Sequence, residues 1–288
     1  MTDAADHELN HLPTAASWLG AAFARPKVLA VVCLTALAGL GWLYLALLLA
    51  RMGGTAIPFA NAIVDALCRP LVDGQTSLTG FGIVALMWAA MTFAMMLPSA
   101  APMILTYAEI GDTAARKGEH IISPFLLAAG YMVVWLGFAA AASVTQLALT
   151  RAALIDPSMA SASELFSGAI FIAAGLYQFS SLKHACLTQC QQPFPFFFTN
   201  WATTPRGVFL LGLRQGLYCV GCCWAMMLVM FAVGVMNVIW MAALGLVMTI
   251  EKIGTGKRFT HAVGAALLAI GVGFILSAFA VHWPVRVI

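Results

Sequence analysis

The chain has 288 residues, of which 62% are hydrophobic and only 9% are charged, and its formal net charge is +3. Soluble domains average about 25% charged residues, so a surface this apolar excludes an ordinary water-soluble globular protein. The few charges are spread among loops and form no basic block, which excludes the usual electrostatic footprint of nucleic-acid binding. The composition therefore predicts that the chain is embedded in a lipid bilayer.

The first 27 residues are predicted to form a polar cytoplasmic tail. This segment has no basic n-region, and no A-x-A-like cleavage site follows the first apolar run. That run is therefore expected to be a retained helix and not a signal peptide. Residues 28–288 are predicted to form a single transmembrane domain.

Seven apolar segments follow the tail, and a membrane-spanning helix needs roughly 20 such residues. They are Val28–Ala50, Gly80–Ala108, Ser123–Thr150, Ser163–Leu182, Gly207–Val233, Met236–Ile250 and His261–Val281. The predicted fold is an all-α, polytopic bundle of about seven transmembrane helices. The fifth and sixth segments are expected to form a tight hairpin, with one broken helix as the alternative.

The charged residues predict the orientation of the bundle. Lys and Arg concentrate before the first segment and after the second, fourth and sixth segments. Because cytoplasmic loops are enriched in these residues, we expect a cytoplasmic N-terminus. Arg214, the clearest charge within an apolar segment, is expected to pair with Glu109 or Glu251.

Two connecting segments are more than plain linkers. Residues 57–67 are expected to form a short helix at the membrane surface. The sequence QQPFPFFFTNWATTP covers residues 191–205, and its Pro193 and Pro195 are expected to prevent a regular helix. Its aromatic side chains are predicted to anchor this loop at the lipid headgroups, with a gate for a ligand as the alternative.

The fifth segment contains the strongest pattern, YCVGCCWAMMLVM. Sulfur-bearing side chains recur at i, i+3, i+4, i+7, i+8 and i+11, which is one face of a helix. They are Cys219, Cys222, Cys223, Met226, Met227 and Met230. Thiolates and thioethers are soft ligands that suit Cu(I), so this face is a predicted copper site. The alternative is ordinary packing by small and flexible core residues.

The geometry of a helix limits how these sulfurs meet. Cys222 and Cys223 project about 100° apart, so one helix is not expected to place all three thiols around one ion. Cys219 and Cys223 are the expected pair, with Met226 as a weaker outer ligand. Cys222 is expected to meet another helix, reaching Met241 or Asn237 of the sixth segment or a Met of the second.

Cys186 and Cys190 form a second pair, four residues apart after the fourth segment. If that helix continues, the two thiols share one face. Such spacing is common among both metal ligands and redox pairs. The pair is predicted to be the transfer point at the cytoplasmic face.

The second segment contains Pro98 and Pro102, which disturb the helical hydrogen-bond ladder. The carbonyl groups that they free must face protein, water or a ligand when the surroundings are lipid. We therefore expect a broken span in which Met96, Ser99 and Met103 flank a site or hinge. A proline kink that only shapes the bundle is the alternative.

Three stretches resemble a bacterial family of predicted metal-binding integral membrane proteins, catalogued as DUF2182. They are AMMLPSAAPM (Ala94–Met103), GLYQFSSLKHACLTQCQQP (Gly175–Pro193) and GLRQGLYCVGCCWAMMLVMFAVGVMNVIWMAALGLVMTIEK (Gly212–Lys252). The chain departs from the family pattern at Ser180-Ser181, where members often have Thr-Pro, and at Gln191, where they often have a basic residue. The resemblance implies a location in a bacterial inner membrane and copper handling, and no particular reaction.

The predicted function is binding of Cu(I) by Cys- and Met-lined membrane helices, for transport or for delivery to a client. The predicted partners are the bilayer and either a metal carrier or a membrane enzyme. One alternative is a membrane thiol–disulfide redox protein, for which Cys219-Val-Gly-Cys222 has suitable spacing. Another is an assembly or structural subunit of a membrane enzyme. No catalytic triad, phosphate-binding loop or haem motif points to a catalysed reaction.

Overall fold

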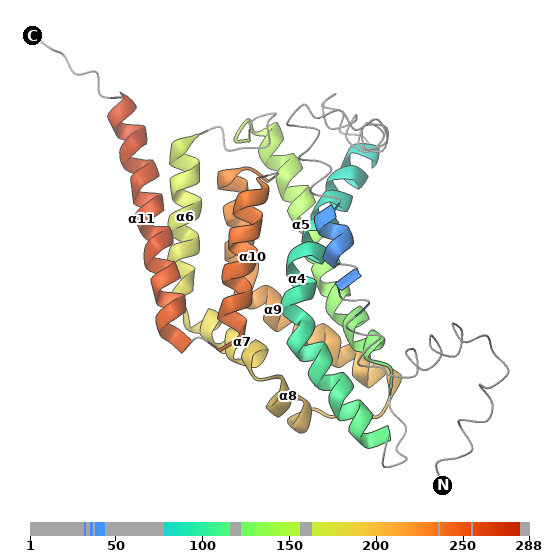
Figure 1. Ribbon diagram of the computed structural model, residues 1–288. Coiled ribbons are helices and arrows are strands. Elements are labelled where there is room, and N and C mark those ends of the chain that lie inside the picture. The colour runs from blue at the N-terminus through green and yellow to red at the C-terminus, as the bar shows by residue number, and fades with distance from the viewer. Residues whose placement is uncertain are drawn as a thin grey trace, which may run out of the picture.

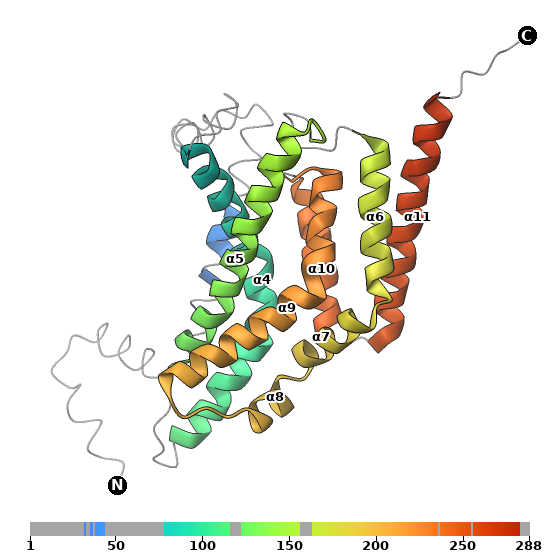
Figure 2. The ribbon, with the colours of Figure 1, turned by 180° about the vertical axis from the view of Figure 1, so that it is seen from behind.

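The computed structural model describes residues 32, 35–36, 38–43, 78–115, 122–155, 163–235, 237–254 and 256–282. These residues form helices and their connections, without a β-strand, and the helices are gathered into one bundle (Figures 1 and 2). The prediction of an all-α fold is confirmed. The polar tail at residues 1–27 and the surface helix expected at 57–67 lie outside the described residues.

Among the described residues, four helices are long and apolar enough to cross a membrane. They are α4 (Leu78–Ala115), α5 (Pro124–Arg151), α9 (Pro205–Val233) and α11 (Gly256–His282). Helices α6 (Glu164–Gln178) and α7 (Ser181–Gln191) meet at a bend of 65° and add a fifth candidate if they form one span. These apolar helices are compatible with a membrane protein.

The expected seven spans are not all found in the described part of the chain. Helix α10 (Val238–Lys252) has 15 residues, which at 1.5 Å per residue is about 22 Å, shorter than a bilayer core of roughly 30 Å. The described residues of the first expected span are helical, but most of that span lies outside the described residues. The described residues therefore contain four or five candidate spans.

The predicted hairpin between the fifth and sixth segments is present. Helix α9 ends at Val233, and Gly234 follows with a φ of 99°, a conformation that favours glycine. The N–H group of Asn237 donates to the Gly234 carbonyl at 3.0 Å and closes the turn. Helix α10 then runs back along α9, so that Lys252 at its end reaches Cys219.

Glycines allow two helix pairs to pack closely. A Cβ atom at Gly212 of α9 would overlap the carbonyl oxygen of Leu127 in α5. A Cβ atom at Gly168 of α6 would lie 2.9 Å from the carbonyl oxygen of Gly271 in α11. Small residues permit such close approach between membrane helices. The first of these pairs holds α9, the most buried of the long helices, against α5.

Helix α4 runs through Pro98 and Pro102 as one element, so the expectation of a broken span is wrong. Pro98 lacks the N–H group that would bond to the carbonyl of Ala94. The indole N–H of Trp42 donates to that carbonyl instead, at 3.0 Å. The helix continues because a side chain satisfies the backbone group that the proline leaves free.

A short helix forms where two prolines were expected to prevent one. Helix α8 (Pro193–Thr199) has both prolines in its first turn, where backbone N–H groups need no intrahelical partner. The buried ring of Phe197 packs on Tyr107 of α4, with centroids 5.4 Å apart. Helices α7 and α8 lie together at one end of the bundle, the lower end in Figure 1. This is called the α7–α8 end below.

Candidate metal centre

Three thiols of α9 form the centre of the candidate site. The Sγ atoms of Cys219, Cys222 and Cys223 all lie within 4.8 Å of one another, and all three side chains are buried. The Sγ atoms of Cys222 and Cys223 are 3.3 Å apart. The expectation that one helix cannot bring the three together is wrong, because rotation about each Cα–Cβ bond moves adjacent sulfurs toward each other.

A fourth thiol reaches this cluster from α7. The Sγ atom of Cys190 lies 3.9 Å from that of Cys222. Cys222 thus meets another helix, as predicted, but its partner is Cys190 and not Met241 or Asn237. The bend of 65° between α6 and α7 makes this possible, because it turns α7 toward α9 (Figure 2).

The two candidate ligands from the sixth segment lie elsewhere. Asn237 is the N-cap of α10, and its side-chain oxygen accepts a hydrogen bond from the Trp240 N–H at 3.3 Å. Met241 is buried near the same end of α10. The opposite end approaches the thiols, through Lys252. Lys252 lies eleven positions after Met241, which corresponds to about 16 Å of helix.

Cys186 packs directly against the backbone of α9. A Cβ atom at Gly221 would lie only 2.7 Å from the Cys186 Sγ atom, so the glycine leaves the space that this thiol fills. The hydroxyl group of Tyr177 donates to the Gly221 carbonyl at 2.5 Å and adds a contact from α6. Cys186 and Cys190 lie one turn apart on α7, so the predicted shared face exists, but on a separate helix that follows the bend after α6.

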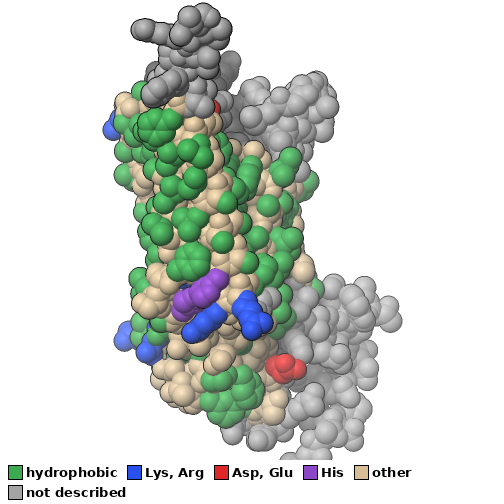
Figure 3. Space-filling view, turned by 90° about the vertical axis from the view of Figure 1, so that its left-hand side faces the viewer, with side chains coloured by type: hydrophobic (Ala, Val, Ile, Leu, Met, Phe, Trp, Pro, Cys, Tyr) green, Lys and Arg blue, Asp and Glu red, His purple; other side chains and the backbone are tan. Residues whose placement is uncertain are grey.

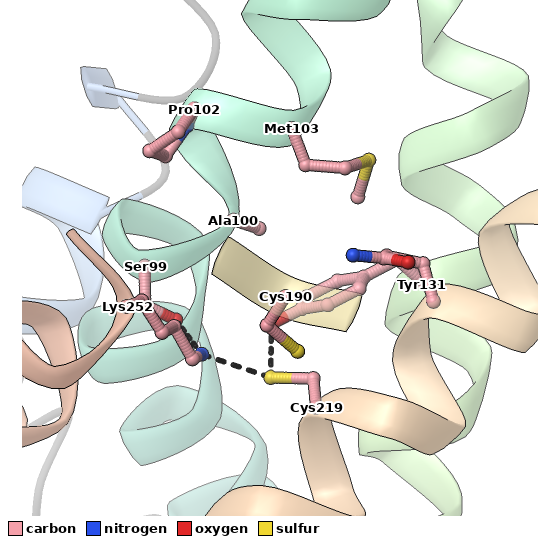
Figure 4. Close-up of a pocket in the computed structure, with 9 residues that line it drawn as sticks. Ser99, Ala100, Pro102, Met103, Tyr131, Cys190, Cys219 and Lys252 are labelled. Carbon is pink, nitrogen blue, oxygen red and sulfur yellow. Dashed lines mark hydrogen bonds between the residues drawn. The ribbon is translucent and has the colours of Figure 1, made fainter. Parts of the chain in front are cut away.

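A buried ammonium group completes the centre (Figure 4). The Nζ atom of Lys252 donates to the Cys219 Sγ atom at 2.9 Å and to the Ser99 hydroxyl at 2.7 Å. The Tyr131 hydroxyl lies 3.0 Å from the same sulfur. A buried cation is costly unless a negative group pairs with it, and a Cys219 thiolate supplies that charge. The sequence pattern placed Lys252 among the loop charges, so its role in the site was missed.

A small cavity adjoins Cys219. Its volume of about 20 Å³ is enough for one water molecule or one ion. Its lining includes Ser99, Met103, Tyr131, Cys190, Gln215 and Lys252. The side-chain oxygen of Gln215 is buried and has no hydrogen-bond partner among the described residues. The cavity is therefore a polar, thiol-edged space at the meeting point of five helices, α4, α5, α7, α9 and α10.

The residues expected around the prolines of α4 are brought to this centre. Met103 and Ser99 line the cavity. Met96 is buried, and its carbonyl oxygen accepts hydrogen bonds from the hydroxyl groups of Ser99 at 2.8 Å and Tyr131 at 3.3 Å. The backbone carbonyl of Met96 thus orients Ser99 and Tyr131, which both contact the centre.

Met226 is buried on the sulfur face and already has a partner. The amide Nε2 of Gln178, from α6, lies 3.0 Å from the Met226 Sδ atom. Thioether sulfur is a weak acceptor, so this contact positions the methionine at little cost to its availability as a ligand. The remaining amide oxygen of Gln178 has no hydrogen-bond partner among the residues that the structure describes.

The charged side chains near the centre do not form the expected pair between Arg214 and Glu251. Glu251, one of the two expected partners of Arg214, forms a buried ion pair with Lys183 at 2.8 Å. Exposed Arg214 donates to Asn200 at 2.8 Å. The side chain of Gln191 also donates to the Glu251 carbonyl, at 2.6 Å. These bonds fasten α7 to α10 beside the thiols, since Lys183 and Gln191 belong to α7.

Comparison with known proteins adds one finding. A family model described as a copper chaperone, PpoB2, matches residues 85–274, which is 190 of the 288 residues. Searches of curated proteins and of solved structures gave no match. The matched range contains the three thiols of α9, both cysteines of α7 and the ammonium group beside them. The chain belongs to the PpoB2 family of copper chaperones.

Proposed function

We propose that the protein is a membrane-embedded chaperone that holds Cu(I) at Cys219, Cys222 and Cys223 and delivers it to a client. The observation that carries this proposal is the mutual reach of the three buried thiols, with Sγ atoms within 4.8 Å of one another. Membership of a copper chaperone family supports copper as the cargo. A chaperone passes its bound ion to another protein, so we propose that the copper is delivered to a client.

The chemistry of the donors favours Cu(I) among common metal ions. Thiolates are soft ligands, and Cu(I) is satisfied by two or three of them. Zinc in structural sites takes four ligands in a tetrahedral arrangement, whereas here the ammonium group of Lys252 occupies one side of Cys219. Met226 is the outer ligand of the proposed site, held one turn beyond Cys222 on the sulfur face.

Cys190 gives the bound ion a way out of the cluster. Its Sγ atom lies 3.9 Å from that of Cys222, so a copper ion on Cys222 can gain the Cys190 thiolate before it leaves another sulfur. Such stepwise exchange avoids a bare ion in an apolar interior. Cys186 lies one turn before Cys190 on α7, and the pair forms the proposed transfer point.

We place the α7–α8 end in the cytoplasm of a bacterium, with the protein in the inner membrane. Most basic residues of the described helices lie at this end, including Arg206, Lys257 and Arg258, whereas Arg151 lies at the other. Cytoplasmic boundaries of membrane helices are enriched in Lys and Arg. A reporter fused after Lys117 should be cytoplasmic and one fused to the C-terminus periplasmic. The opposite pattern would reverse the side of the transfer point.

Copper content of the purified protein tests the proposal. Full-length protein in detergent is loaded with Cu(I) under reducing conditions and washed, and bound copper is measured by elemental analysis. The Cys219→Ser/Cys223→Ser variant should lose the copper that is ligated by sulfur, and Cys33→Ser should keep it. If wild-type protein holds no such copper, the proposal fails, and trapped mixed disulfides or co-purifying subunits would then identify a redox or an assembly role.

A further inference from the structure

Two histidines meet on the surface of the bundle, away from the thiol centre. His184 of α7 and His261 of α11 have their Nε2 atoms 3.2 Å apart. The rings are steeply inclined, at 77°, with centroids separated by 5.3 Å. His261 is exposed and His184 half-buried. The nitrogens that point at each other are the atoms that imidazole uses to bind transition metals.

The surrounding helices hold both rings in place. The ring of Phe179, in the bend between α6 and α7, stacks on His261 at 5.1 Å and 26°. A Cβ atom at Gly264 of α11 would lie 2.7 Å from the same phenylalanine ring, so α11 is seated closely on the bend. His184 follows Lys183, which is tied to Glu251 by the buried ion pair. The two imidazoles are thus fixed by packing on separate helices.

The pair lies at the border between two kinds of surface. Figure 3 shows histidine side chains beside Lys and Arg side chains, below a mainly hydrophobic surface. Leu276 and Phe279 of α11, the helix that carries His261, and Leu182 of α7 are exposed apolar residues. A metal ion in water or at the headgroup level can therefore reach the imidazoles, whereas the thiol centre is buried.

Helix α7 connects this pair to the proposed delivery route. His184 and Cys186 are two residues apart and so lie about 200° apart around the helix. The imidazole faces α11, while the thiol packs on Gly221 of α9. Cys190 lies six positions after His184, or about 9 Å along the helix axis. The histidines therefore form a site separate from the thiols but carried by the same short helix.

From this geometry we infer a second metal site, in which His184 and His261 capture Cu(I) at the surface of the α7–α8 end. Imidazole is a suitable copper ligand, and Cu(I) is stable with two donors. Lys257 lies one turn before His261 and acts electrostatically on His184, which favours a monovalent ion over a divalent one. The inference rests on the proposed function, because capture at this site supplies the buried thiols.

X-ray absorption of the Cu(I)-loaded protein tests this inference, because it separates nitrogen from sulfur ligands. Wild-type protein, His184→Gln, His261→Gln and Cys219→Ser/Cys223→Ser are loaded with Cu(I) alone under reducing conditions. His282→Gln, which changes a histidine at the opposite end of α11, is the matched control. Each sample is first checked for a single symmetric peak in size-exclusion chromatography.

Both the wild type and His282→Gln should show copper ligated by sulfur and copper ligated by imidazole nitrogen. His184→Gln and His261→Gln should each lose the nitrogen-ligated copper and keep the sulfur-ligated copper, whereas the double cysteine variant should do the reverse. The inference is overturned if the wild type has no nitrogen-ligated copper, or if this copper survives in both histidine variants. The contact between His184 and His261 is then only a hydrogen bond between two imidazoles. Absence of the sulfur-ligated copper alone overturns the proposed function and not this site.

Discussion

The ammonium group of Lys252 lies 2.9 Å from the Sγ atom of Cys219, within a site where both side chains are buried. A cation at this depth requires a negative partner. When Cys219 and Cys223 bind the ion as thiolates and Cys222 stays a neutral thiol, the two thiolates, one Cu(I) ion and the ammonium group sum to zero charge. A divalent ion on the same two thiolates leaves an excess positive charge. Lys252 therefore favours a monovalent over a divalent metal ion.

Replacing Lys252 with Met should reverse this preference. Without the ammonium group, a divalent ion on two thiolates is the neutral combination. The ratio of Cu(I) affinity to Cd(II) affinity should fall by about tenfold or more, which corresponds to about 1.4 kcal/mol. Competition titrations of purified protein with each metal measure the ratio. Arg206→Met, which removes an exposed positive charge, should leave the ratio unchanged, and an unchanged ratio in Lys252→Met would contradict the charge argument.

A methyl group at Gly221 should push α7 away from α9. Its Cβ atom would lie 2.7 Å from the Cys186 Sγ atom, and overpacking of this kind costs about 1–3 kcal/mol. Gly221→Ala should therefore lower the free energy of unfolding in mixed micelles and slow copper release, because Cys190 moves with α7. Gly137→Ala is the control, since no atom lies within 4 Å of that Cβ position. Equal stability of the two variants would show that α7 is not seated on α9 as described.

The sulfur face of α9 was predictable because its spacing is a property of one helix. Cys219, Cys222 and Cys223 need only a regular α-helix to share a face, and that helix forms. The contact between Cys190 and Cys222 was not predictable, because it depends on a 65° bend and on the direction in which α7 then runs. That direction is set by contacts with other helices.

The same distinction explains why Lys252 was missed and α8 was not expected. Lys252 reaches Cys219 only because the turn at Gly234 sets the register between α9 and α10. Nothing in the local sequence gives that register. In α8, Pro193 and Pro195 were interpreted as helix breakers without regard to position, but both lie in a first turn that tolerates proline.

The buried ion pair between Lys183 and Glu251 should matter most to stability when only one of its partners is removed. Removing one partner leaves an uncompensated charge, which costs roughly 3–5 kcal/mol. Lys183→Met and Glu251→Gln should each destabilise by about this amount in mixed-micelle unfolding, and the double variant by less than their sum. Arg214→Gln, at an exposed polar contact, should cost about 0–1 kcal/mol. Additive effects of the two buried substitutions would show that the charges do not interact.

Replacing Cys190 with Ser should separate the holding of copper from its release. The three thiols of α9 remain, so bound Cu(I) at equilibrium should be unchanged under reducing conditions. Serine is a hard oxygen donor and a poor ligand for Cu(I). The variant therefore lacks the sulfur that, in the wild type, lies 3.9 Å from the Cys222 Sγ atom and receives the ion in the exchange step. Release to an external Cu(I) chelator should slow by about tenfold, equivalent to about 1.4 kcal/mol in the barrier. Stopped-flow absorbance of the chelator complex measures this rate, with Cys33→Ser as the matched thiol control. A variant that releases copper at the wild-type rate would remove Cys190 from the route, and one that no longer holds copper would make Cys190 a ligand of the resting site.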